Sequence, residues 1–153
     1  MRQFLKYWLP VLVWMTVIFG ASADRNSHEH SQHIFRPLLL WLFPHMTDQE
    51  FENIHWVLRK CAHLTVYAIL GLLVFRALSH SHTGLNKWSW PRVGGALLIV
   101  FLYAATDEYH QSFVPGRTAL LSDVFIDTSG AAAGLLALWI YQRLRTPKSQ
   151  QLQ

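Results

Sequence analysis

The sequence alternates long apolar runs with short polar segments, and four of the runs are long enough to cross a membrane. A transmembrane helix needs about 20 mainly apolar residues. We therefore predict an all-α integral membrane bundle with four transmembrane helices. The expected spans cover approximately residues 7–23, 57–78, 92–111 and 118–141.

The first run has two interpretations, a retained span and a cleaved signal peptide. It follows Arg2 and Lys6 and ends in the small residues 21–23. A basic start, an apolar core and a small-residue end also describe a secretory signal peptide. The bulky Trp8 and Trp14 and the length of the run favour a retained span. Both interpretations stay open at this point.

The segment between the first two spans predicts a loop followed by a short helix at the membrane surface. Residues 24–33 are polar and rich in histidine, but the histidines lack the regular spacing of zinc ligands, so we expect a solvated loop. Residues 34–43 are apolar and too short to span, which favours an interfacial or re-entrant helix. Thr47 and Glu50 then form a capping-box pattern that predicts the start of the next helix.

The composition supports a small membrane protein of one domain. With 52% hydrophobic residues and seven tryptophans in 153 residues, the chain is more apolar and aromatic than a typical soluble domain. The single cysteine, Cys61, excludes an internal disulfide, and we interpret it as a small core residue. One domain is expected over residues 1–146, followed by a polar tail over 147–153.

The basic residues indicate the orientation in the membrane. The net charge of +4 is modest, and the basic residues concentrate at the two chain ends and in the loop after the second span. Cytoplasmic loops carry an excess of Lys and Arg. We therefore expect a bacterial cytoplasmic (inner) membrane protein with both termini in the cytoplasm, and no nucleic-acid partner. The residues concerned are Arg2, Lys6, Lys87, Arg92, Arg143, Arg145 and Lys148.

Polar residues from three spans fall at one depth in this topology. Lys60, His63 and Tyr67 are spaced three and four residues apart, which places them on one helical face near the outer side. An ionisable residue near the bilayer centre costs roughly 3 kcal/mol or more, so such residues are usually paired and often functional. We therefore predict a site at this depth. Its residues are Lys60, His63, Tyr67, Asp107, Glu108, Gln111, Arg117, Asp123 and Asp127.

These residue types suggest two roles. Arg117 and Lys60 can hold a phosphate or a carboxylate, Arg117 with two parallel hydrogen bonds. Desolvated acids with a nearby histidine suit general acid–base chemistry. The proposed substrate-binding residues are Lys60, Tyr67, Gln111, Arg117 and Asp127. The proposed catalytic residues are His63, Asp107, Glu108 and Asp123.

Other chemistries are poorly supported by the sequence. No serine or cysteine lies in a nucleophile motif, so a covalent mechanism is not expected. A divalent metal held by His63, Glu108 and Asp123 is disfavoured by the neighbouring Lys60 and Arg117. We expect no metal and no cofactor.

A plainer interpretation assigns the same residues a structural role. In that case Lys60 and Arg117 only neutralise the acids, and the ion network fixes helix packing. Gly130 and Gly134 supply a small-residue face for close approach of another helix, which makes a helix-packing partner at this face a further candidate. A transporter is a third interpretation, which would need oligomerisation to enclose a path.

Three blocks of the sequence resemble the VanZ-like family of small bacterial membrane proteins. They are KCAHLTVYAILG over residues 60–71, DEYHQSFVPGR over 107–117 and SDVFIDTSGAAAG over 122–134. The first span, which ends in small residues and a serine, also resembles the opening helix of that family. The founding member is associated with resistance to teicoplanin, a lipid-tailed glycopeptide. The resemblance therefore implies a cell-envelope protein and, by association, antibiotic resistance.

Two hypotheses for function follow. In the first, the protein binds, and in its stronger form modifies, an anionic amphiphile such as a membrane lipid or a lipid-linked or glycopeptide-type molecule at a polar site that faces the outer leaflet. In the second, it is a non-catalytic membrane interaction or accessory protein. The sequence leaves open whether the protein is an enzyme.

Overall fold

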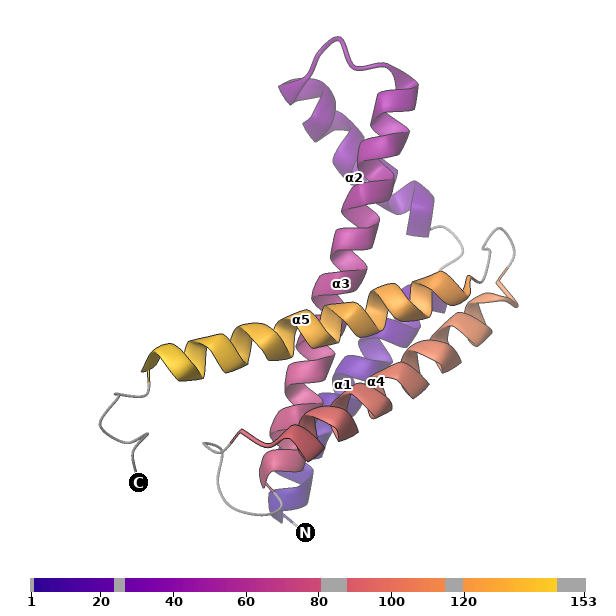
Figure 1. The fold of residues 1–153 in the computed structure, drawn as a ribbon. Coiled ribbons are helices and arrows are strands. Elements are labelled where there is room, and N and C mark those ends of the chain that lie inside the picture. Colours follow the sequence, from indigo (N-terminus) through magenta and orange to yellow (C-terminus); the bar gives the residue numbers. More distant parts are fainter. Residues whose placement is uncertain (1, 24–26, 81–87, 115–119, 146–153) are drawn as a thin grey trace.

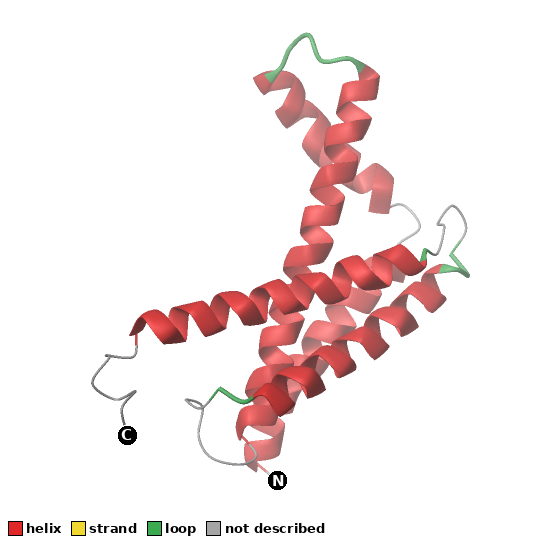
Figure 2. Cartoon of the chain, viewed as in Figure 1, coloured by secondary structure: helices red, strands yellow, loops and turns green. Residues whose placement is uncertain are grey.

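The computed structural model describes residues 2–23, 27–80, 88–114 and 120–145 (Figure 1). All the regular structure in these ranges is helical, which confirms the predicted all-α class (Figure 2). The helices are α1 (Arg2–Ala23), α2 (Ser27–Leu42), α3 (Asp48–His80), α4 (Trp90–Gln111) and α5 (Leu121–Arg145).

Three of these helices are long and apolar enough to cross a membrane. They comprise Phe4–Ser22 of α1, Asp48–Ser79 of α3 and Leu121–Arg145 of α5. The fourth predicted span, residues 92–111, coincides with α4, which is not among these three helices. The last turns of α4 contain two acids, a histidine and a glutamine. Four transmembrane helices are therefore not confirmed by length and composition.

Contacts between helix ends show in which direction each helix runs. At one end of the bundle, the Arg76 guanidinium of α3 lies 5.3 Å from the ring centroid of Tyr7 in α1. The Phe75 ring lies 5.3 Å from that of Trp88, which precedes α4. At the other end, Ser22 of α1 and Gln111 of α4 are hydrogen-bonded. α1 and α4 thus run from the first end to the second, and α3 runs the opposite way (Figure 1).

The first half of α3 extends beyond the rest of the bundle and carries α2 (Figure 1). With 33 residues, α3 is about 50 Å long, against about 30 Å for the hydrocarbon core of a bilayer. It starts with the predicted capping box, since the Thr47 amide donates to Glu50 Oε2 at 2.8 Å and the Glu50 amide to Thr47 Oγ1 at 3.3 Å. Phe51 and His55 are buried under α2.

The predicted loop over residues 24–33 is wrong from Ser27 onward, because α2 begins there. Bonds to α3 explain the added helical turns. Ser31 Oγ lies 2.8 Å from His55 Nε2, and the side-chain amide of Gln32 donates to Glu52 Oε1 at 2.7 Å. The sequence pattern of residues 24–33 is locally polar and could not reveal these partners. The placement of α2 at the membrane surface stays a prediction.

Small residues let α5 approach α3 very closely. A Cβ added to Gly130 would meet the Leu64 backbone, one on Gly134 would meet Ala68 at 3.0 Å, and one on Gly71 would meet Ala131 at 2.8 Å. The small-residue face expected on α5 is therefore covered by α3 of the same chain. A helix-packing partner from another chain at Gly130 and Gly134 stays a prediction, and it is not needed to cover these two glycines.

A core of apolar side chains joins α1, α3, α4 and α5. It is built around the fully buried Tyr67, Leu70, Val100 and Leu135. Cys61, which the sequence pattern suggested as a core residue, is exposed. Lys60 and His63 of α3 contact α5, and Cys61 lies on a different side of α3 from these two residues.

Candidate functional site

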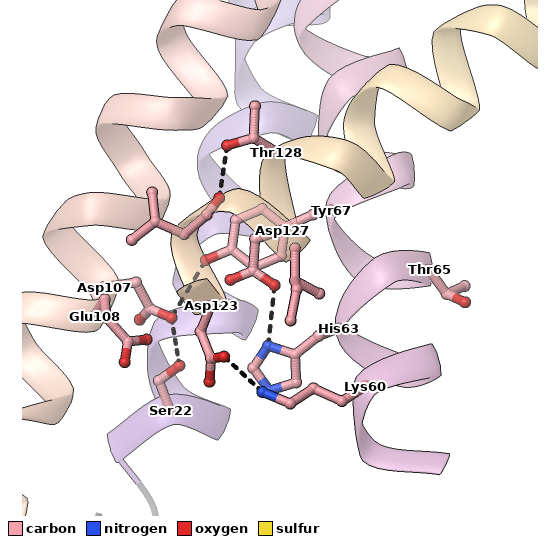
Figure 3. A network of polar contacts seen from close by, with 12 residues as sticks. Ser22, Lys60, His63, Thr65, Tyr67, Asp107, Glu108, Asp123, Asp127 and Thr128 are labelled. Carbon is pink, nitrogen blue, oxygen red and sulfur yellow. Dashed lines mark hydrogen bonds and ion pairs between the residues drawn. The ribbon is translucent and has the colours of Figure 1, made fainter. Parts of the chain in front are cut away.

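Nine polar side chains of four helices lie together, and we call them the polar cluster; Figure 3 labels all of them except Gln111. α3 positions three of them on one face, because residues spaced three and four apart lie on the same side of a helix. α4 and α5 supply their partners, and α1 adds a serine. The polar cluster consists of Ser22, Lys60, His63, Tyr67, Asp107, Glu108, Gln111, Asp123 and Asp127.

The outer edge of the polar cluster is an ion pair between α3 and α5. Lys60 Nζ donates to Asp123 Oδ1 at 2.6 Å, and the two side chains are 23% and 21% exposed. Lys60 Nζ also lies 5.7 Å from the ring centroid of Trp56. The ammonium is therefore already neutralised by a partner of its own chain.

One helical turn further along each helix, His63 faces Asp127. His63 Nδ1 lies 3.2 Å from Asp127 Oδ1, and the Asp127 side chain is 3% exposed against 33% for His63. A carboxylate that binds one ring nitrogen orients the imidazole and leaves the other nitrogen for a second partner. The imidazole of His63 is therefore held in place by a buried carboxylate.

Asp107 is one of the most deeply buried groups of the polar cluster, at 2% exposure. Its Oδ2 accepts hydrogen bonds from Ser22 Oγ at 2.7 Å, Gln111 Nε2 at 3.0 Å and Tyr67 Oη at 3.3 Å. Gln111 Nε2 also donates to Ser22 Oγ at 3.1 Å. The other carboxylate oxygen of Asp107, Oδ1, is buried and has no hydrogen-bond partner among the residues that the structure describes. All three donors therefore hold one oxygen and leave the second for another group.

Ser22 is a member of the site that sequence reasoning missed. The sequence pattern placed it among the small residues that end the first apolar run, a feature shared by a signal-peptide end and by the opening helix of the resembled family. In the structure it is buried and donates a hydrogen bond to Asp107 of α4. Its position at the end of the first apolar run was the available signal, because the predicted topology places that end level with the predicted site. The contacts also show that α1 is part of the packed bundle.

Glu108 differs from the other acids because a backbone group occupies it. Its Oε1 accepts from the Leu120 amide at 2.6 Å. Leu120 immediately precedes α5, where the helix dipole favours a negative charge. This contact ties the end of α4 to the start of α5, and it gives Glu108 a positioning role in this structure.

Of the nine predicted site residues, Arg117 lies outside the described residues, and the other eight belong to the polar cluster. Four carboxylates therefore face one lysine and one histidine among the residues described. Within those residues, no three side chains of His, Cys, Asp or Glu are arranged to hold a metal ion. The arrangement offers buried acceptors, an oriented imidazole and four acids, each in direct contact with a cation or a hydrogen-bond donor.

Comparison with known proteins gives one match. The family model described as VanZ/LLP1 matches residues 7–142. No curated protein and no solved structure matches this chain significantly.

Proposed function

The chain belongs to the VanZ/LLP1 family, and on that premise we propose that it is an integral membrane protein that binds an amphiphile of the cell envelope at the polar cluster. The amphiphile is a membrane lipid or a lipid-linked or glycopeptide-type molecule. Its apolar part lies among the helices and the surrounding lipid, and its polar part meets the cluster.

The observation that carries this proposal is the buried carboxylate of Asp107. It lies at 2% exposure within a bundle of membrane-type helices, and one of its oxygens lacks a partner. Ionisable groups in membranes are costly, so they commonly mark substrate sites or proton relays. A purely structural carboxylate would be expected to have both oxygens satisfied.

The four-span topology is part of the proposal, with α4 as the fourth span. Asp107, Glu108 and Gln111 of α4 are buried against protein, whereas Leu98, Leu102 and Tyr109 are exposed on another face. Such a helix presents lipid with apolar side chains although its composition is mixed. The termini then lie in the cytoplasm, α2 lies at the outer surface, and the membrane is the inner membrane.

The charge of the ligand needs a different argument from the one the sequence suggested. An anionic group was expected because Lys60 and Arg117 would anchor it. Lys60 is held by Asp123 at 2.6 Å, so an anion would have to displace a carboxylate that the chain itself supplies. We therefore retain an amphiphile as the ligand and drop the requirement that its polar group be negative.

In the stronger form of the proposal the protein also modifies its ligand. The His63–Asp127 pair would exchange a proton with the ligand through the second imidazole nitrogen. Asp107 would serve as a general acid or base toward the group bound at its free oxygen. Asp123 would hold Lys60, and Glu108 would position α5. Resistance to teicoplanin-type glycopeptides, which family resemblance implies, would be one outcome of altered envelope amphiphiles.

The test is a mass-spectrometric profile of envelope lipids and peptidoglycan precursors in cells that lack the protein. The cells are complemented at matched membrane levels with wild type, with Asp107→Asn, or with Asp48→Asn. Asp48 is the control because it is exposed and pairs with Arg36 outside the polar cluster. We expect a species that accumulates in the deletion strain and is cleared by wild type and Asp48→Asn, but not by Asp107→Asn.

The second candidate is a non-catalytic accessory protein whose ion network fixes the packing. The Lys60–Asp123 and Glu108–Leu120 contacts favour it, because each joins two helices and each is complete without a ligand. Unchanged profiles, or equal restoration by wild type and Asp107→Asn, would exclude the enzyme and leave this candidate.

A further inference from the structure

Two buried polar atoms on one face of α4 lack hydrogen-bond partners. They are Asp107 Oδ1 and His110 Nδ1. Asp107 and His110 are three residues apart, so their side chains leave the helix on the same side. Leaving a buried polar atom unpaired costs free energy, and each such atom in a folded protein calls for an explanation.

Both side chains face α1. Asp107 accepts a hydrogen bond from Ser22, and the His110 ring centroid lies 4.3 Å from that of Phe19. Ser22 and Phe19 are themselves three residues apart on α1. The two unpaired atoms therefore lie along a single seam between α1 and α4, on the α1 side of the polar cluster.

The chemistry of the two atoms selects the group that would satisfy them. A carboxylate oxygen only accepts, and the imidazole nitrogen accepts when its other nitrogen carries the proton. In that tautomer both atoms are acceptors, so one group that satisfies both is a donor. It also enters a region in which four carboxylates face one lysine, and that lysine is already paired with Asp123.

We propose that the seam between α1 and α4 binds a primary ammonium group, which donates to Asp107 Oδ1 and His110 Nδ1. An ammonium has three donors and no acceptor, so it matches two unpaired acceptors. It also brings positive charge to a cluster in which four acids outnumber the single lysine. This inference rests on the proposed function, since it identifies the polar part of the amphiphile as amine-bearing. A free amine shares the same chemistry.

The test uses purified protein in detergent and native mass spectrometry with two lipids that have identical acyl chains. One is phosphatidylethanolamine, and the other is its N-acetyl derivative, which lacks the positive charge but retains the phosphate. We expect wild type to bind phosphatidylethanolamine at least about tenfold more tightly, because a hydrogen bond to a charged group is lost on acetylation. Free ethanolamine, added as a competitor, distinguishes the two sources: displacement at micromolar levels would assign the seam to a soluble amine.

Two variants tie the preference to the seam. Asp107→Asn should reduce the ratio of the two affinities to about one, and His110→Phe, which keeps a ring against Phe19, should reduce it partly. Asp48→Asn should leave the ratio unchanged. The His110→Phe ratio decides the question if Asp107→Asn does not fold.

The inference and the proposed function fail in different ways. Equal binding of both lipids by wild type, or a ratio that survives both seam variants, would overturn the ammonium assignment and leave amphiphile binding intact. If wild type binds neither lipid, nor any lipid of the parent envelope extract, the proposed function itself fails.

Discussion

The Lys60–Asp123 pair is a contact whose energy can be measured directly. Both side chains are about one quarter exposed or less, at 23% and 21%, whereas those of the Arg36–Asp48 pair between α2 and α3 are 49% and 87% exposed. Burial strengthens an ion pair and also makes it costly to remove one partner. The two pairs therefore offer a comparison within one protein.

We predict a coupling energy of about 1–2 kcal/mol for Lys60 and Asp123 in a double-mutant cycle with Lys60→Gln and Asp123→Asn. The corresponding cycle on Arg36 and Asp48 should give less than about 0.5 kcal/mol, because exposed pairs are weak. Both are measured as free energies of unfolding in detergent. Equal coupling in the two pairs would show that the outer edge of the polar cluster is solvated.

The residues of the polar cluster were predictable to different degrees. The spacing of Lys60, His63 and Tyr67 is enough by itself to place them on one helical face. Their partners were not predictable, because pairing depends on how each helix is rotated about its axis. Because of that rotation, the neighbours Asp107 and Glu108 have different partners. Asp107 keeps a free oxygen that suits a ligand, whereas Glu108 accepts a hydrogen bond from a backbone amide.

At the scale of the helices, the backbones of α3 and α5 approach each other very closely. Gly130 lies against the Leu64 backbone, so a side chain there can be accommodated only if the helices separate. Gly94 of α4 has no neighbour within 4 Å of an added Cβ. The two glycines thus differ in packing although both lie inside a helix.

Gly130→Ala should destabilise the protein by roughly 2 kcal/mol or more, because overpacking forces a shift of two backbones. Gly94→Ala should be neutral or stabilising by up to about 1 kcal/mol, since alanine favours a helix. Thermal unfolding in a fixed detergent measures both. A Gly130→Ala variant as stable as Gly94→Ala would contradict the close approach of α5 to α3.

The helices also show where local patterns mislead. Residues 27–33 are polar and read as a loop, but they form the first turns of α2 because Ser31 and Gln32 bond to α3. The capping box at Thr47 and Glu50 was predicted correctly, because it needs only residues that are three positions apart.

For the complete bundle, the decisive prediction concerns which side of the membrane each end occupies. In a Cys61→Ala background, a cysteine at Gln49 should react with a membrane-impermeant maleimide in intact spheroplasts. A cysteine at Arg143 should react only after permeabilisation, because positive residues remain in the cytoplasm. The single native cysteine makes this background simple to build.

Labelling of both cysteines from outside would place the end of α5 on the outer side and reject the four-span topology. Cysteines at Leu98 and Leu102 serve as a second control. Both residues are exposed on α4 and should be protected by lipid in the intact membrane if α4 spans it.

Hydropathy, helical spacing and charge bias are properties of short segments, so the sequence was sufficient for the helical class and the family. The depth of the polar residues in the membrane stays a prediction. Other features depend on how helices pack, and the folded bundle alone supplies them. Ser22 joins the polar cluster because α1 lies beside α4, and Lys60 is neutralised because α5 crosses α3 at Gly130. The two unpaired atoms on α4 also appear only there, because a missing partner is defined by every neighbour at once.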